Sequence, residues 1–169
     1  MFNGALIAIL FQGVAKQPEN LVDINNVIGS LFIFMMQLFT STNYPVMVTF
    51  GLEKPVFIRE VQSKMYSLFS YYFAKNLIEI PLTFISPLVM QVIVYWAVGY
   101  QQNYIRFWMM YLVLVVMVFS ATGLGFLIGA TSNSVESSSA MATAFIMPIL
   151  AFSGLVVNNS TLPVWFRWI

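Results

Sequence analysis

Long apolar runs alternate with short polar segments along the whole chain. Four of these runs, at residues 27–50, 72–98, 107–131 and 140–157, are close to the length of about 20 residues that crosses a hydrocarbon core. They predict an all-α, polytopic bundle with four full transmembrane helices. A shorter apolar run at residues 4–14 is too short to span alone. We expect it to be the end of a first membrane helix, with a re-entrant or interfacial segment as the alternative.

Two of the runs contain residues that indicate packing against other helices. Gln37 and the polar stretch 40–43 interrupt the first full span, and polar side chains in lipid need partners, so this face should point to other helices or a cavity. Ala121, Gly125 and Gly129 repeat every four residues. This spacing places small residues on one helix face and predicts close packing there.

Charge is concentrated in one segment. Residues 53–79 hold seven of the thirteen charged residues. We expect Gly51 to end the preceding span and residues 53–70 to leave the bilayer. Apolar residues recur every fourth position from Phe57 to Met65, a pattern typical of a short amphipathic helix lying at the membrane surface.

The loops also predict an orientation. Lys54, Arg59 and Lys64 cluster on one side of the membrane, and the positive-inside rule therefore places residues 53–70 in the cytoplasm. The two overlapping glycosylation sequons within Asn158–Thr161 then lie outside, which agrees with that orientation.

Two interpretations are open for each group of charges. Lys75 and Glu79 lie one helical turn apart. They could form an interfacial ion pair of little consequence, or a polar relay that carries movement from the cytoplasmic helix into the membrane. The charges from Glu53 to Lys64 could belong to a solvated linker that sets topology, or to a surface that docks a partner. The clustering of both signs on one short helix favours docking.

Composition excludes several classes of function. With 60% hydrophobic and 8% charged residues, the chain cannot be a water-soluble domain, and without a basic patch it has no support as a nucleic-acid binder. Cysteine and histidine are absent, which removes thiolate, zinc-thiolate and histidine chemistry. Asp23 is the only aspartate, so an intramembrane aspartyl dyad is impossible within one chain. No GxxxxGK[ST] motif occurs, so we expect no catalytic residues, no metal site and no ATP-binding loop.

Two separated motifs then indicate a family. The segment Leu52–Pro81, LEKPVFIREVQSKMYSLFSYYFAKNLIEIP, resembles the link between the second and third membrane helices of ABC transporters of the G (White-type) subfamily. The string FSGLVVN at Phe152–Asn158, followed by LPVWFRWI at Leu162–Ile169, is similar to the fifth helix of that subfamily and the segment after it. The resemblance covers essentially the whole chain.

This resemblance implies a partial ABC-2 type transmembrane domain with no ATPase domain of its own. It implies an ATP-driven exporter of lipids, sterols or other lipophilic compounds that works by alternating access in the plasma membrane or an internal membrane. ATP and magnesium would bind a separate nucleotide-binding domain, and a second half-transporter would complete a homo- or heterodimer. A non-transporting or truncated membrane scaffold without its own ATPase is the alternative.

The resemblance also implies four sets of site residues. The residues that couple to the ATPase domain would be Glu53, Lys54, Arg59, Glu60 and Lys64. The polar relay would be Lys75 and Glu79. The substrate cavity would be lined by Phe32, Phe39, Thr143, Met147 and Leu150. The apolar plug above the cavity would be Leu155 and Val156.

Overall fold

The structure, a computed structural model, describes residues 7, 9–12, 21–100, 103–132 and 134–151. All regular secondary structure in these ranges is helical, which confirms the predicted all-α class. The long helices are α2 (Leu21–Gln62), α3 (Leu68–Val98), α4 (Tyr104–Thr131) and α5 (Val135–Ala151).

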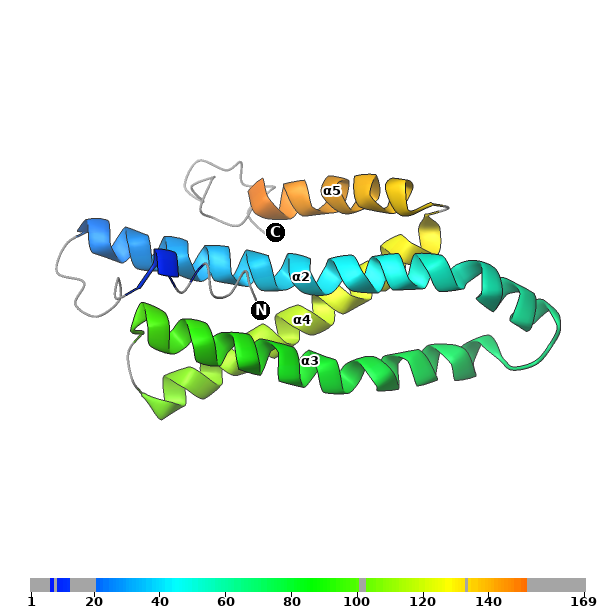
Figure 1. The fold of residues 1–169 in the computed structure, drawn as a ribbon, viewed down its shortest axis with the longest axis horizontal. Helices are drawn as coiled ribbons and strands as arrows, with labels where there is room; N and C mark the ends of the chain where they lie inside the picture. Colours follow the sequence, from blue (N-terminus) through cyan, green and yellow to red (C-terminus); the bar gives the residue numbers. More distant parts are fainter. Residues whose placement is uncertain (1–6, 8, 13–20, 101–102, 133, 152–169) are drawn as a thin grey trace, which may run out of the picture.

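Successive helices run in opposite directions (Figure 1). α2 and α3 form a long antiparallel pair, α4 crosses this pair obliquely, and α5 lies along the opposite side of α2 from α3. α2 packs most extensively against α4 and much less against α3. The turn between α2 and α3 and the turn between α4 and α5 lie at the same end of the bundle (Figure 1).

α2 is much longer than the sequence predicted. Gly51 does not end it: the helix continues for 42 residues from Leu21 to Gln62, with Pro45 and Pro55 inside it. At about 1.5 Å per residue such a helix is about 63 Å long, roughly twice the thickness of a hydrocarbon core. The prediction of a separate helix at residues 53–70 is therefore wrong. Residues 53–62 form the end of α2, and the chain then turns and enters α3 at Leu68.

Local signals explain the other helix boundaries. Ser67 caps the start of α3 by accepting a hydrogen bond from the Ser70 amide, and Gly99 ends α3 in the left-handed region with φ 81°, where glycine is favoured. Asn103 caps α4 in the same way as Ser67 caps α3. α3 and α4 thus begin a few residues earlier than residues 72 and 107, where we expected them.

Three of the described helices, namely α2, α3 and α4, are long and apolar enough to cross a bilayer. The described part of α5 has 17 residues, and the rest of the expected span at 140–157 lies outside the described residues. The chain is therefore an integral, multi-pass membrane protein.

The contact between α2 and α4 is the closest in the bundle. Ala121, Gly125 and Gly129 face α2 and are buried, as the four-residue repeat predicted. A Cβ atom on Gly125 would lie 3.0 Å from the Asn43 carbonyl oxygen, and one on Gly129 would lie 3.0 Å from that of Met47. Glycine at these two positions therefore lets the helix backbones approach closely without a steric conflict.

Apolar side chains fill the bundle on both sides of this contact. The larger buried cluster joins α2, α3 and α4 and includes Phe34, Leu38, Val94 and Leu114. Ile7, from the apolar run at 4–14, also packs into this cluster. A smaller cluster joins α2, α4 and α5 through Met47, Ile128 and Ala142. α5 is therefore held against α2 and α4.

Substitutions at the glycines test the close approach. Gly125→Ala or Gly129→Ala should lower the free energy of unfolding of the purified protein by about 1–3 kcal/mol, because the added methyl group pushes against the backbone of α2. Thermal or detergent-induced unfolding measures this change. Gly123→Ala is the matched control, since nothing lies within 4 Å of its Cβ position. It should be neutral or raise stability by about 0.5–1 kcal/mol, and equal losses in all three variants would contradict the packing.

Candidate functional site

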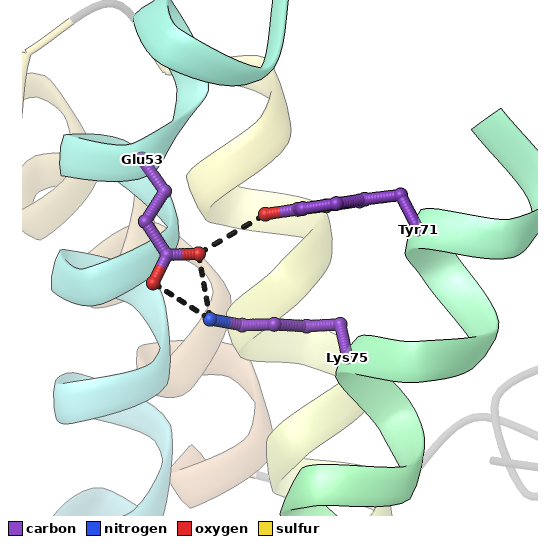
Figure 2. A network of polar contacts seen from close by, with 3 residues as sticks. All are labelled: Glu53, Tyr71 and Lys75. Carbon is purple, nitrogen blue, oxygen red and sulfur yellow. Dashed lines mark hydrogen bonds and ion pairs between the residues drawn. The ribbon is translucent and has the colours of Figure 1, made fainter. Parts of the chain in front are cut away.

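The charged end of α2 is joined to α3 by an ion pair. The Lys75 ammonium donates to both carboxylate oxygens of Glu53, at 2.8 and 2.6 Å, and the Tyr71 hydroxyl donates to the same carboxylate at 3.0 Å. Figure 2 shows both α3 side chains pointing at Glu53. The Lys75 side chain is 16% exposed and that of Glu53 41%. A half-buried ammonium needs such a partner, so this pair fixes the register of α2 against α3.

The neighbouring residue joins α2 to α4. The Lys54 ammonium donates to the backbone carbonyls of Ala130 and Ser132, each at 2.7 Å. These carbonyls lie at the C-terminus of α4, where backbone acceptors lack partners within the helix and a cation is favourable. Next to them, the hydroxyls of Ser132 and Ser138 are hydrogen-bonded to each other and join α4 to α5.

Packed aromatic rings stabilise the turn between α2 and α3. The Tyr66 hydroxyl donates to the Glu60 carboxylate at 2.6 Å. The Tyr66 ring stacks on that of Tyr71, with centroids 5.9 Å apart, and Tyr71 also packs against Phe57 at 4.4 Å. The hydrogen bond to Glu60 raises the pKa of Tyr66 to about 12, assisted by desolvation and by the charge of Glu60.

Two basic residues at this end point away from the bundle. Arg59 is exposed in the last turn of α2, and Lys64 is exposed in the turn that follows. Lys64 has a left-handed backbone with φ 57°, so it lies outside the regular helix that carries Glu60. Of the five expected coupling residues, Glu53, Lys54 and Glu60 thus contact other parts of this chain.

The expected relay residues Lys75 and Glu79 have separate surroundings. Lys75 pairs with Glu53 on the neighbouring helix, whereas Glu79 is half-buried and lines a pocket between α2, α3 and α4. Among the described residues, no group of three or more carboxylate, cysteine or histidine side chains could hold a metal ion.

The expected cavity residues lie on two separate helices. Phe32 and Phe39 are half-buried on one face of α2. Thr143 and Met147 are exposed on α5 and share a face with Leu150. Three pockets in the described part of the chain are lined by other residues. Leu155 and Val156 lie outside the described residues.

Sequence reasoning missed the partners of Glu53 and Lys54. Glu53 and Lys75 are 22 residues apart, and Lys54 and Ser132 are 78 apart. A signal was available for the first pair, because two long helices joined by a short turn bring together residues that lie at similar distances from the turn. The second pair depends on the crossing of α4, which no local pattern indicates.

Exchange of the ion pair tests its role in the fold. Glu53→Lys or Lys75→Glu alone should each lower the free energy of unfolding by roughly 1 kcal/mol, a moderate loss because Glu53 is partly exposed. The double exchange should recover most of this loss, since it restores opposite charges. Thermal unfolding of the purified variants measures the effect, and additive losses in the double variant would argue against a direct pair.

Titration tests the Tyr66 contact. The phenol of Tyr66 should ionise near pH 12 rather than near its ordinary pKa of 10.0, as measured by the phenolate absorbance lost in Tyr66→Phe. The folded-state pKa is raised, so the stabilising contribution is fully present below pH 10 and is lost as the pH rises towards 12. Glu60→Gln should return the pKa towards 10. An unchanged titration in that variant would mean that another group raises the pKa.

Comparisons with known proteins agree with these observations. The family model described as "ABC-2 type transporter" matches residues 1–169. The chain is 27% identical to Protein white of Ceratitis capitata over 97% of the chain and 24% of that relative. It is 33% identical to ABC transporter G family member 42 of Arabidopsis thaliana, over 99% of the chain and 12% of the relative.

A third relative is the ABC transporter ATP-binding protein/permease wht-1 of Caenorhabditis elegans, which is 24% identical over 97% of the chain and 24% of its own length. The chain thus spans at most about a quarter of the relatives it matches. Because the family model covers every residue and the long apolar helices fit it, the chain belongs to the ABC-2 type transporter membrane-domain family, with relatives among White and ABC transporter G proteins.

Proposed function

We propose that this chain is the membrane-spanning part of an ATP-driven exporter that moves lipids, sterols or other lipophilic compounds by alternating access. ATP and magnesium would bind a separate nucleotide-binding domain. The name of the nematode relative, an ATP-binding protein and permease of which this chain covers 24%, supports an ATPase elsewhere in a longer protein. A second half-transporter, identical or different, would complete the translocation path.

The observation that carries this proposal is the projecting end of α2. This end presents exposed Arg59, while Glu53 and Lys54 join it to α3 and α4. A force applied at Arg59 would therefore move three helices together. An ATPase domain that drives transport must move the membrane helices in this way. Lys64 extends the same basic surface into the turn.

The relay is better assigned to Glu53 and Lys75 than to Lys75 and Glu79. Glu53 and Lys75 are in direct contact across two helices, so a shift of one helix changes the position of the other. Glu79, one helical turn after Lys75 in α3, would be the next residue of the relay. The expected cavity residues would face the substrate once a second half-transporter packs against this chain. They are Phe32, Phe39, Thr143, Met147 and Leu150.

Substitution of Arg59 tests coupling. In the full-length transporter that carries this chain, Arg59→Ala should reduce substrate-stimulated ATP hydrolysis by about tenfold or more, because a charge-assisted contact to the ATPase domain is lost. Basal hydrolysis should change less, since Arg59 does not touch the nucleotide. ATPase assays in reconstituted vesicles measure both rates.

Arg106→Ala is the matched control. Arg106 is also an exposed arginine, in the first turn of α4, at the end of the bundle away from the α2–α3 turn (Figure 1). This variant should keep its stimulated rate. Equal stimulated rates in the two variants would overturn the coupling role of Arg59, and full transport without any ATPase partner would overturn the proposed function.

A further inference from the structure

Two adjoining pockets form a groove between α2 and α3. Their volumes are about 330 and 190 Å³, and they share Ser41, Leu82 and Ser86 in their linings. Both pockets have apolar and polar lining residues, and the smaller one also holds a charged side chain. The polar residues of the smaller pocket are Ser41, Thr42, Glu79, Thr83, Ser86 and Thr122.

Four of the five hydroxyl groups that line the smaller pocket are oriented as acceptors. Ser41 and Thr42 donate to the Leu38 carbonyl at 3.0 and 2.9 Å, and Thr83 donates to the Glu79 carbonyl at 2.9 Å. Thr122 likewise donates within its own helix. The hydrogens of these four hydroxyl groups are therefore used locally, and their oxygen lone pairs are left for another donor.

Glu79 supplies the charge of this groove. It is the one charged residue in the linings of the two pockets, and it is half-buried. Within the described residues its carboxylate has no hydrogen-bond or ion-pair partner, and the ammonium of Lys75, one turn earlier on α3, binds Glu53. A carboxylate within a membrane-spanning helix is costly without a cationic or hydrogen-bonding partner.

We propose that this groove binds the protonated primary amine of an amphiphilic molecule. The ammonium group would lie against Glu79 and donate to the hydroxyl oxygens around it, since an ammonium has three donors and no acceptor. The hydrocarbon chain would lie along the apolar part of the larger pocket, which includes Ile85, Val89 and Met90. The same chemistry is found in amine headgroups of lipids and in lipophilic amines. Binding of either requires no transport, so this inference is independent of the proposed function.

A binding assay with three matched probes tests the chemistry. The full-length protein that carries this chain is placed in phosphatidylcholine nanodiscs, and binding of dodecylamine, dodecyltrimethylammonium and dodecanol is measured. Dodecylamine should bind at least about tenfold more tightly than dodecanol, with dodecyltrimethylammonium between them because it has charge but no donors. Equal binding of the amine and the alcohol would overturn the proposal.

Substitutions locate the site. Glu79→Gln keeps the size of the side chain and should weaken dodecylamine binding by about tenfold or more. Leu82→Trp should also weaken binding by filling the groove at a residue shared by both pockets. Glu136→Gln is the matched control, because Glu136 is an exposed carboxylate in the first turn of α5. Equal losses in Glu136→Gln and Glu79→Gln, or no loss in either groove variant, would overturn the site.

A change of lipid separates the two sources of the amine. If phosphatidylethanolamine in the nanodiscs competes with dodecylamine, and this competition disappears in Glu79→Gln, the natural occupant is a lipid headgroup. If phosphatidylethanolamine does not compete while the probe still binds at Glu79, the site selects a single-chain lipophilic amine. Both outcomes support an ammonium site, and circular dichroism of each variant verifies that the helices are intact.

Discussion

The close approach of α2 to α4 is the constraint on which the other contacts depend. At Gly125 and Gly129 the two backbones are so near that a single added carbon would meet a carbonyl oxygen. The same approach lets the buried Asn43 side chain donate to the Ala121 carbonyl at 2.9 Å. It also brings the end of α4 within reach of Lys54. Without these small residues the polar contacts between the helices could not form in this geometry.

The two sides of α2 differ in chemical character. Towards α4, small and apolar residues pack tightly, and the buried amide of Asn43 has a hydrogen-bond partner. Towards α3, packing is sparser, and hydroxyl groups and Glu79 line open pockets. Tight packing suits a contact that is kept, whereas a polar and loosely packed contact suits a ligand or a change of helix position. α2 therefore makes a tight contact with α4 and a looser, more polar one with α3.

The polar contacts at the end of α2 connect these two sides. Adjacent residues point in different directions: Glu53 contacts α3 and Lys54 contacts α4. Tyr66 and Tyr71 stack beside them and close the turn. α2 is thus held against two other helices about two turns before its end. A helix held by such contacts passes a displacement of its end on to the helices it contacts, whereas a flexible linker would not.

The sequence alone determined the features that depend on local pattern. Long apolar runs predicted the membrane helices, because only helices satisfy every backbone hydrogen bond in lipid. The repeat from Ala121 to Gly129 predicted the packing face of α4, and the Leu52–Pro81 motif predicted the family that the comparisons then identified. The end of α2 at Gly51 was wrongly predicted, since glycine costs a helix only about 1 kcal/mol relative to alanine, and continuing backbone hydrogen bonds and tertiary contacts outweigh it.

Only the tertiary structure decided that Lys75 pairs with Glu53, that Lys54 binds the end of α4 and that Glu79 lines a groove. These contacts join residues 22 and 78 positions apart, and they depend on helix register and crossing, which are properties of the packed bundle and not of any single segment.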